Sequence, residues 1–285
     1  MTTPATDERV DVGGLTLAVR RWEAAGTPFV LVHGLASTAR TWEAVARELV
    51  ASGSAVATVD LRGHGRSDTP ASGYDTASVV ADLIGVVEAL GWDRPVLVGQ
   101  SWGGNLALAY AWTAPDTVRG VAGVDGGTIE LQARWPVWED CARDLAPPSV
   151  AGKTIDDLAA EQREEHPDWS DEAVAAALAS YVVRDDGTVA PILDRDHHLA
   201  ALRGLWEQRP SSLYPQIAVP VLLLPAGDRD ASWTDDKRAE VDAAAAALAR
   251  ARVRWFPDSD HDVHLQRPAE VAQALRAAVD DGFFA

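Results

Sequence analysis

The chain has 285 residues, 47% of them hydrophobic, and its 43 acidic and 25 basic side chains give a formal net charge of −18 at pH 7. Such an acidic surface argues against nucleic acid and anionic membranes as partners, and the single cysteine, Cys141, allows no internal disulfide. The polar first residues and the lack of an apolar run of about 18 residues argue against a secretory signal and a membrane-spanning helix. We therefore expect a soluble cytoplasmic protein.

Short apolar runs, typical of buried strands, alternate with helical patterns in the first 126 residues. In the first helical pattern Trp42, Val45 and Leu49 recur at helical spacing, and Gly53 ends the helix. The alternation predicts an α/β fold, with a mostly parallel central sheet and helices on both faces. The predicted strands are 27–34, 54–65 (with a glycine turn), 94–100 and 118–127, and the predicted helices are 37–53, 76–91 and 101–115.

The alternation stops between residues 127 and 210, where the pattern favours helices and loops. It resumes with strands at 219–228 and 251–257 and helices at 234–250 and 268–280. We therefore expect one core domain made of residues 1–126 and 211–285, with residues 127–210 inserted between two of its strands.

The stretch LVGQSWGG, residues 97–104, places Ser101 between Gly99 and Gly103 at the end of an apolar run. This G-x-S-x-G spacing suits a sharp strand-to-helix turn that strains the serine and exposes its hydroxyl. Glycines are needed because a Cβ at either position would meet the neighbouring strand or helix. A turn serine that caps the next helix is the alternative.

Further motifs accompany this one in a fixed order: HGLAST at 33–38, DLRGHGRSD at 60–68, PAGDRD at 225–230 and DHDVHLQRP at 260–268. With these motifs the chain resembles the α/β-hydrolase superfamily over essentially its whole length. The resemblance implies a nucleophile turn, an oxyanion loop, an acid loop and a terminal histidine loop. It also implies that the inserted segment 127–210 is a helical cap.

The resemblance makes Ser101 the nucleophile, at the carboxyl end of a central strand and at a helix N-terminus. A tetrahedral acyl-transfer intermediate needs two backbone N–H donors, which the resemblance assigns to Trp102 and Leu35. Relatives resembling dehalogenases and epoxide hydrolases are expected to have aspartate at the nucleophile position, so a serine there disfavours those reactions.

The resemblance gives His261 the role of base and places the acid after the strand that follows the insertion, at Asp228. A carboxylate there would hold the imidazole in the correct tautomer and stabilise the imidazolium. Asp125, at the end of the 118–127 strand, is the rival, because some relatives draw their acid from the preceding strand. Otherwise Asp125 caps its turn or contacts substrate.

Aromatic and polar side chains near these motifs are candidates for the substrate pocket, although each tryptophan could equally be core. His33 could act as a second catalytic base, but the family pattern favours a histidine that fixes its loop by hydrogen bonds. Paired histidines at 197–198 lack further ligands at a recognised spacing, so we expect no metal and no cofactor. The pocket candidates are His33, Trp42, Asp125, Trp135, Trp138 and Trp206.

The sequence thus predicts a serine hydrolase that cleaves an ester-like or amide-like bond of a small, largely apolar molecule through an acyl-enzyme. The same triad could instead support carbon–carbon bond hydrolysis, perhydrolysis or lyase chemistry. The alternative outside the enzymes is a hydrolase-like protein that binds a ligand without turnover. No G-x-G-x-x-G follows the first predicted strand, which excludes the usual dinucleotide-binding turn.

Overall fold

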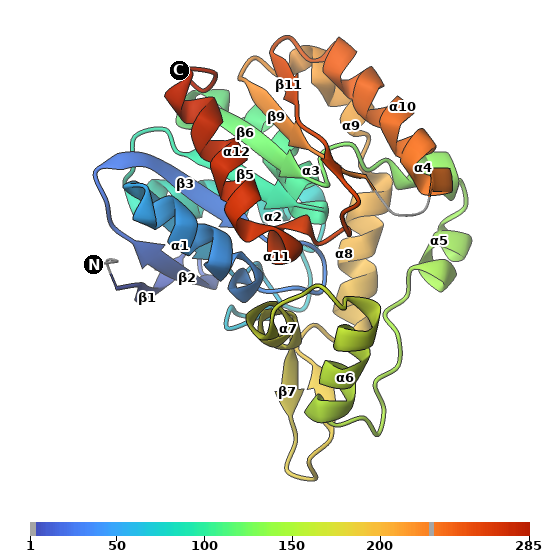
Figure 1. Ribbon diagram of the computed structural model, residues 1–285. Helices are drawn as coiled ribbons and strands as arrows, with labels where there is room; N and C mark the ends of the chain where they lie inside the picture. Colours follow the sequence, from blue (N-terminus) through green and yellow to red (C-terminus); the bar gives the residue numbers. More distant parts are fainter. Residues whose placement is uncertain (1–3, 228–230) are drawn as a thin grey trace.

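The computed structural model describes residues 4–227 and 231–285. Its central sheet has the strand order β1-β2-β4-β3-β5-β6-β9-β11, in which β1 and β2 are antiparallel to their neighbours and the remaining pairs are parallel. The mostly parallel α/β sheet is confirmed (Figure 1). The strands are β1 Thr6–Asp11, β2 Thr16–Trp22, β3 Gly26–Val32, β4 Ser54–Val59, β5 Val96–Gln100, β6 Gly120–Val124, β9 Val221–Leu224 and β11 Ala251–Val253.

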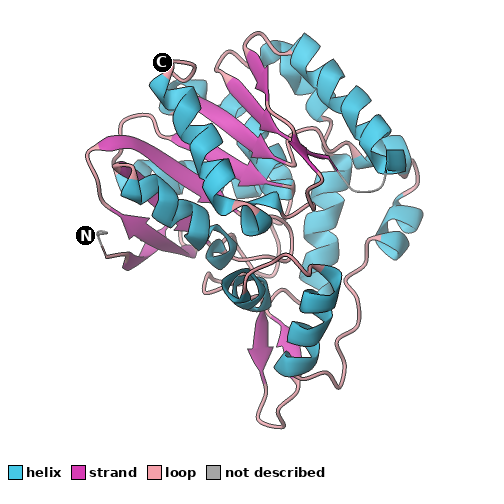
Figure 2. Ribbon diagram, viewed as in Figure 1, coloured by secondary structure: helices cyan, strands magenta, loops and turns pink. Residues whose placement is uncertain are grey.

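Helices cover both faces of this sheet (Figure 2). Alternate residues of β3 point to opposite faces: Phe29 and Leu31 pack with α1 (Glu43–Ala51) and α12 (Pro268–Asp280), whereas Val30 and Val32 pack on the other side. That other side carries α2 (Thr76–Leu90), α3 (Trp102–Thr113) and α10 (Ala231–Ala247). Because both faces are buried, the central strands are continuous apolar runs rather than alternating ones.

Local sequence signals explain where these helices begin and end. The Asp75 carboxylate accepts a hydrogen bond from the backbone N–H of Ser78 at 3.0 Å and caps α2, which ends at Gly91 with a φ of 64°. Pro268 is the first residue of α12, where its missing N–H removes no intrahelical hydrogen bond.

Residues 127–210 lie between β6 and β9 and extend beyond the carboxyl edge of the sheet (Figure 1). The segment contains the expected helices and also a small antiparallel hairpin, β7 Tyr181–Val183 with β8 Val189–Pro191, which the sequence pattern did not indicate. Its helices are α4 Leu131–Arg134, α5 Trp138–Asp144, α6 Ile155–Glu165, α7 Asp171–Leu178 and α8 Arg195–Glu207. The next helix, α9 Pro210–Leu213, begins at the last residue of the segment.

Both ends of the 127–210 segment are bonded to one buried residue of α3, Asn105. The Asn105 Oδ1 accepts hydrogen bonds from the backbone N–H groups of Gly127 at 2.8 Å and Ile129 at 3.3 Å. Its Nδ2 donates to the Ile129 carbonyl at 2.7 Å and to the Gln208 side chain at 3.1 Å. The start and the end of the segment therefore meet at the first turns of the helix that follows Ser101.

Candidate active site

Ser101 occupies the turn between β5 and α3 with φ 52° and ψ −122°, a conformation that non-glycine residues rarely adopt. A Cβ on Gly99 would lie 1.9 Å from the carbonyl oxygen of Gly103, and a Cβ on Gly103 would lie 2.5 Å from that of Val32. Both glycines are therefore required by close backbone approach. The turn places the Ser101 side chain on the wall of a cavity.

A third glycine, which the sequence did not single out, completes this packing. A Cβ on Gly126 would lie 2.2 Å from the Ser101 carbonyl oxygen, while the Ser101 N–H donates to the Val124 carbonyl at 3.0 Å. The loop after β6 therefore presses directly on the Ser101 turn. The pair of glycines after Asp125 is the sequence signal for this contact.

The backbone N–H groups of Leu35 and Trp102 are the two donors that the sequence assigns to an oxyanion hole. Trp102 begins α3, so its N–H is one of the donors that a helix leaves without an intrahelical acceptor. Leu35 lies after β3 and lines the same cavity as Ser101. Within residues 4–227 and 231–285, neither N–H donates a hydrogen bond.

Two buried histidines fix the loop that contains Leu35. The Nδ1 of His33 donates to the Gly34 carbonyl at 2.7 Å, and its Nε2 accepts from the Leu61 N–H at 3.0 Å. The Nε2 of His64 accepts from the Ala36 N–H at 3.3 Å. Burial lowers the pKa of His33 to about 4 and that of His64 to about 3, so both rings are neutral braces.

His261 contacts a carboxylate, and that carboxylate belongs to Asp125. The Nδ1 of His261 donates to Asp125 Oδ2 at 2.6 Å, and the N–H of Ala226 donates to Asp125 Oδ1 at 2.9 Å. Asp125 follows β6 with a φ of 41°, which turns its side chain towards His261. The Asp125 side chain is 4% exposed, whereas that of His261 is 50% exposed and faces the cavity.

This pairing lowers the pKa of Asp125 and raises the pKa of His261, so it favours the ion pair. Burial alone would raise the pKa of Asp125, but the hydrogen bond and charge of His261, with help from Lys237, hold it below its usual range. Desolvation opposes a charged His261, yet the Asp125 hydrogen bond and charge raise the pKa of His261 above its ordinary value. The carboxylate thus favours the imidazolium that forms when His261 accepts a proton.

The acid that the sequence placed at Asp228 lies outside the described residues. The structure instead brings Asp125, proposed as the rival acid and as a pocket residue, to His261. The positive φ of Asp125 and the hydrogen bond from Ala226 direct its carboxylate at the imidazole.

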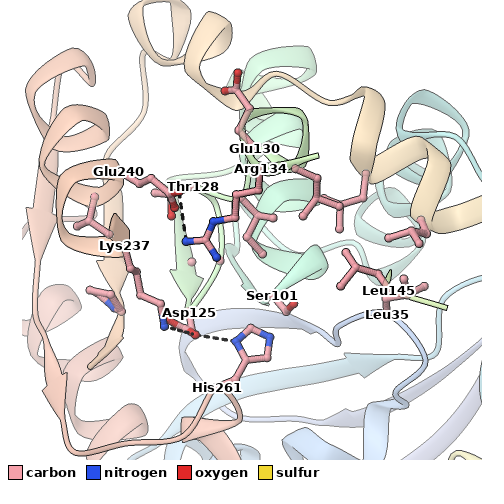
Figure 3. A pocket seen from close by; sticks show the side chains of 18 of the residues that line it. Leu35, Ser101, Asp125, Thr128, Glu130, Arg134, Leu145, Lys237, Glu240 and His261 are labelled. Carbon is pink, nitrogen blue, oxygen red and sulfur yellow. Dashed lines mark hydrogen bonds and ion pairs between the residues drawn. The ribbon is translucent and has the colours of Figure 1, made fainter. Parts of the chain in front are cut away.

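A cavity of about 740 Å³ lies over Ser101 and His261 (Figure 3). Aliphatic side chains of the 127–210 segment form much of its wall, and charged side chains gather at one side, where Arg134 and Glu240 lie 3.6 Å apart. Burial raises the pKa of Glu240. The aliphatic residues are Ile129, Leu131, Leu145, Leu202 and Leu205.

Of the aromatic pocket candidates, Trp135 lies on the cavity wall. Trp138 and Trp206 instead pack against each other with ring centres 5.8 Å apart, under the guanidinium of Arg203. Trp42 is fully buried and packs on His264 in the core below α1. The predictions of pocket roles for Trp42, Trp138, Trp206 and His33 are therefore corrected to packing and loop bracing.

Among the described residues, no group of three or more His, Cys, Asp or Glu side chains is arranged to hold a metal ion. Within the same residues, no helix has the length and apolar character needed to cross a membrane.

An α/β sheet with a serine turn, a buried carboxylate–histidine pair and an adjoining cavity defines a hydrolase-type fold and site. The chain belongs to the alpha/beta hydrolase family, whose model matches residues 29–274. This confirms the family resemblance.

Two relatives of this chain carry the names of hydrolases. It is 35% identical over 117 residues to a 2-(acetamidomethylene)succinate hydrolase of Mesorhizobium japonicum, a match covering 41% of each chain. It is 33% identical over 101 residues to epoxide hydrolase B of Mycobacterium tuberculosis, covering 35% of this chain and 28% of the relative. These matches span less than half of each relative's length.

Solved structures resemble the chain over nearly its whole length. The structure of E-2-(acetamidomethylene)succinate hydrolase superposes with a TM-score of 0.83 at 25% identity, covering 97% of this chain and 100% of that one. The thioesterase domain from the curacin biosynthetic pathway superposes with a TM-score of 0.77 at 20% identity, covering 96% and 100%, which shows the shared fold alone.

Proposed function

We propose that the protein is a serine hydrolase that cleaves an ester-like or amide-like bond of a small, largely apolar molecule. The observation that carries the proposal is the 2.6 Å hydrogen bond between His261 and Asp125 on the wall of the cavity that also exposes Ser101. Nucleophile, base and orienting carboxylate come from three separate loops at the carboxyl edge of the sheet, as a triad requires.

In the proposed reaction, the Nε2 of His261 removes the hydroxyl proton as Ser101 Oγ attacks the carbonyl carbon of the substrate. The developing oxyanion accepts hydrogen bonds from the N–H groups of Leu35 and Trp102. The imidazolium, stabilised by Asp125, then protonates the leaving group as the intermediate collapses to an acyl-enzyme. Water activated by His261 releases the acid and regenerates Ser101.

The identity of residue 101 separates this proposal from the activity named for one relative. Members that resemble epoxide hydrolases are expected to have aspartate at this position, and this chain has serine. The substrate named for the other relative contains an acetamido group, which is the amide-like bond that the proposed acyl-enzyme chemistry would cleave.

We infer that residues 127–210 act as a cap over this site, while residues 1–126 and 211–285 form the core. The inference is supported by the position of the segment beyond the carboxyl edge of the sheet and by its share of the cavity wall. Aliphatic side chains such as Leu131 and Leu202 favour an apolar acyl or leaving group.

The test is labelling and turnover by the Ser101→Ala variant. Wild-type protein should be labelled by a fluorophosphonate probe, and Ser101→Ala should lose the label together with roughly 10³-fold or more of kcat on a 4-nitrophenyl ester. Ser212→Ala is the matched control, because the Ser212 hydroxyl is exposed and donates to the backbone carbonyl of Arg209 in its own turn. Labelling that persists in Ser101→Ala, or none in the wild type, contradicts the proposal.

A further inference from the structure

A lysine from α10 contacts the carboxylate that orients His261. The Nζ of Lys237 donates to Asp125 Oδ2 at 3.1 Å and to the carbonyl oxygen of Ala226 at 3.0 Å. The Lys237 side chain is 17% exposed and lies on the cavity wall beside Asp125 (Figure 3). Neither the general triad arrangement nor the sequence motifs assigned a role to this residue.

We propose that Lys237 is a positioning residue of the proposed serine hydrolase, whose ammonium group holds the Asp125 carboxylate in place and keeps the His261 imidazole available as a base. The inference rests on the proposed function, because it concerns the same triad. Lys237 acts through Asp125 rather than on the substrate.

The first part of the argument is geometric. Ala226 offers its N–H to Asp125 Oδ1 and its carbonyl oxygen to Lys237, while Lys237 bonds Asp125 Oδ2. Asp125, Ala226 and Lys237 therefore form a closed ring of hydrogen bonds that fixes both carboxylate oxygens. With the carboxylate fixed, the direction in which Oδ2 accepts the His261 N–H is fixed as well.

The second part is electrostatic. Asp125 Oδ2 accepts from both the imidazole and the ammonium group, so two cations would share one buried oxygen whenever His261 is protonated. Repulsion by Lys237 therefore disfavours the imidazolium and opposes the rise in the pKa of His261 that Asp125 produces. Lys237 therefore reduces the rise in the pKa of His261 without cancelling it.

Other charged groups near His261 do not supply this balance. Asp262, in the same loop, raises the pKa of His261, and the neutral ring of His264 is buried behind that loop. Asp260 bonds His166 at 3.0 Å, and Glu240 pairs with Arg134 at one side of the cavity. Among the described residues packed against the triad, Lys237 is therefore the ammonium group placed to oppose the imidazolium.

The experiment compares two substitutions that separate charge from hydrogen bonding. Lys237→Gln removes the charge and keeps an N–H donor, whereas Lys237→Arg keeps the charge. Arg238→Gln is the matched control, because it removes one positive charge from the neighbouring, exposed position of α10. The measurement is kcat and KM on a neutral 4-nitrophenyl ester from pH 5 to about 10, with circular dichroism of each variant.

For Lys237→Gln we expect the acid limb of the kcat/KM profile to move to higher pH, with kcat at pH 7 falling about tenfold and KM little changed. Lys237→Arg should keep the limb near its wild-type position, and Arg238→Gln should match the wild type. NMR titration of the His261 ring gives a second measurement that does not need turnover, and it should show the same order of variants.

A Lys237→Gln profile that coincides with the wild type, or a change in KM alone, overturns the inference. So does a limb that moves as far in Lys237→Arg as in Lys237→Gln, because a purely structural role would treat both alike. If these variants match the wild type while Ser101→Ala is inactive, the inference fails and the proposed function stands. If Ser101→Ala keeps its activity, the proposed function itself fails.

Discussion

Replacement of Asp125 by asparagine tests the assignment of the acid most directly. Among the described residues, the carboxylate accepts hydrogen bonds from Ala226 at 2.9 Å, Lys237 at 3.1 Å and His261 at 2.6 Å. An asparagine whose oxygen keeps the Ala226 bond turns its NH₂ group towards both Lys237 and His261, where donors would face donors. The imidazole then relieves the clash by accepting at Nδ1, which places its proton on Nε2, the atom that must receive the Ser101 proton.

The wrong tautomer and the lost negative charge act on the same step. From the effect of such substitutions in serine-hydrolase triads, Asp125→Asn should lower kcat by roughly 10³- to 10⁴-fold, or about 4 to 5.5 kcal/mol at about 1.36 kcal/mol for each tenfold change. The backbone should tolerate the change, because asparagine accepts the φ of 41° at this position as readily as aspartate does.

The assay is steady-state hydrolysis of one 4-nitrophenyl ester at a fixed pH, with circular dichroism and thermal unfolding to show that each variant is folded. Asp228→Asn is the comparison, because the sequence motif assigns the acid to that residue. We expect Asp125→Asn to lose far more kcat than Asp228→Asn. The opposite ranking in folded proteins would refute the reasoning and return the acid to Asp228.

Two further predictions concern the base and the cavity. Asp125 raises the pKa of His261, and the base must be neutral to accept a proton. Wild-type kcat/KM should therefore rise with pH through a limb above 6.5, the ordinary pKa of histidine. A limb at or below pH 6.5 would show that the carboxylate does not control the imidazole. Trp135→Ala removes a side chain from the cavity wall, whereas the ring of Trp138 packs on Trp206. Trp135→Ala should therefore change KM, or the ranking of a series of acyl esters, more than Trp138→Ala does. Equal effects of the two variants would contradict the placement of the cavity.

The central strands could be predicted because burial on both faces makes their apolar runs continuous. Most helices could be predicted because their apolar residues recur at helical spacing. The last helix, 268–280, was predicted with the bounds it has, since Pro268 marks its start. The antiparallel strands β1 and β2 gave a weaker signal, because β1 lies at the sheet edge and is largely exposed, with charged residues such as Asp7 and Arg9. The short helix α11, Val263–Gln266, lies within the histidine motif and was missed.

The Ser101 turn could be predicted because a close backbone approach requires glycine at fixed positions in the sequence. The acid could not be fixed in the same way, since Asp125 and Asp228 both follow apolar strands. The positive φ and the Ala226 contact that direct Asp125 depend on how two distant loops meet. The same limit applies to the tryptophans: composition does not distinguish Trp135 on the cavity wall from Trp42 in the core.

The hydrogen bonds of Asn105 have a consequence for how this protein can diversify. Since both ends of residues 127–210 are tied to one buried side chain of the core, the distance between those ends does not depend on the length or sequence of what lies between them. We therefore expect that natural variation or laboratory recombination can replace the interior of this segment while Asn105 and the two junctions are kept. The specificity of the proposed hydrolase would then change without a redesign of the core.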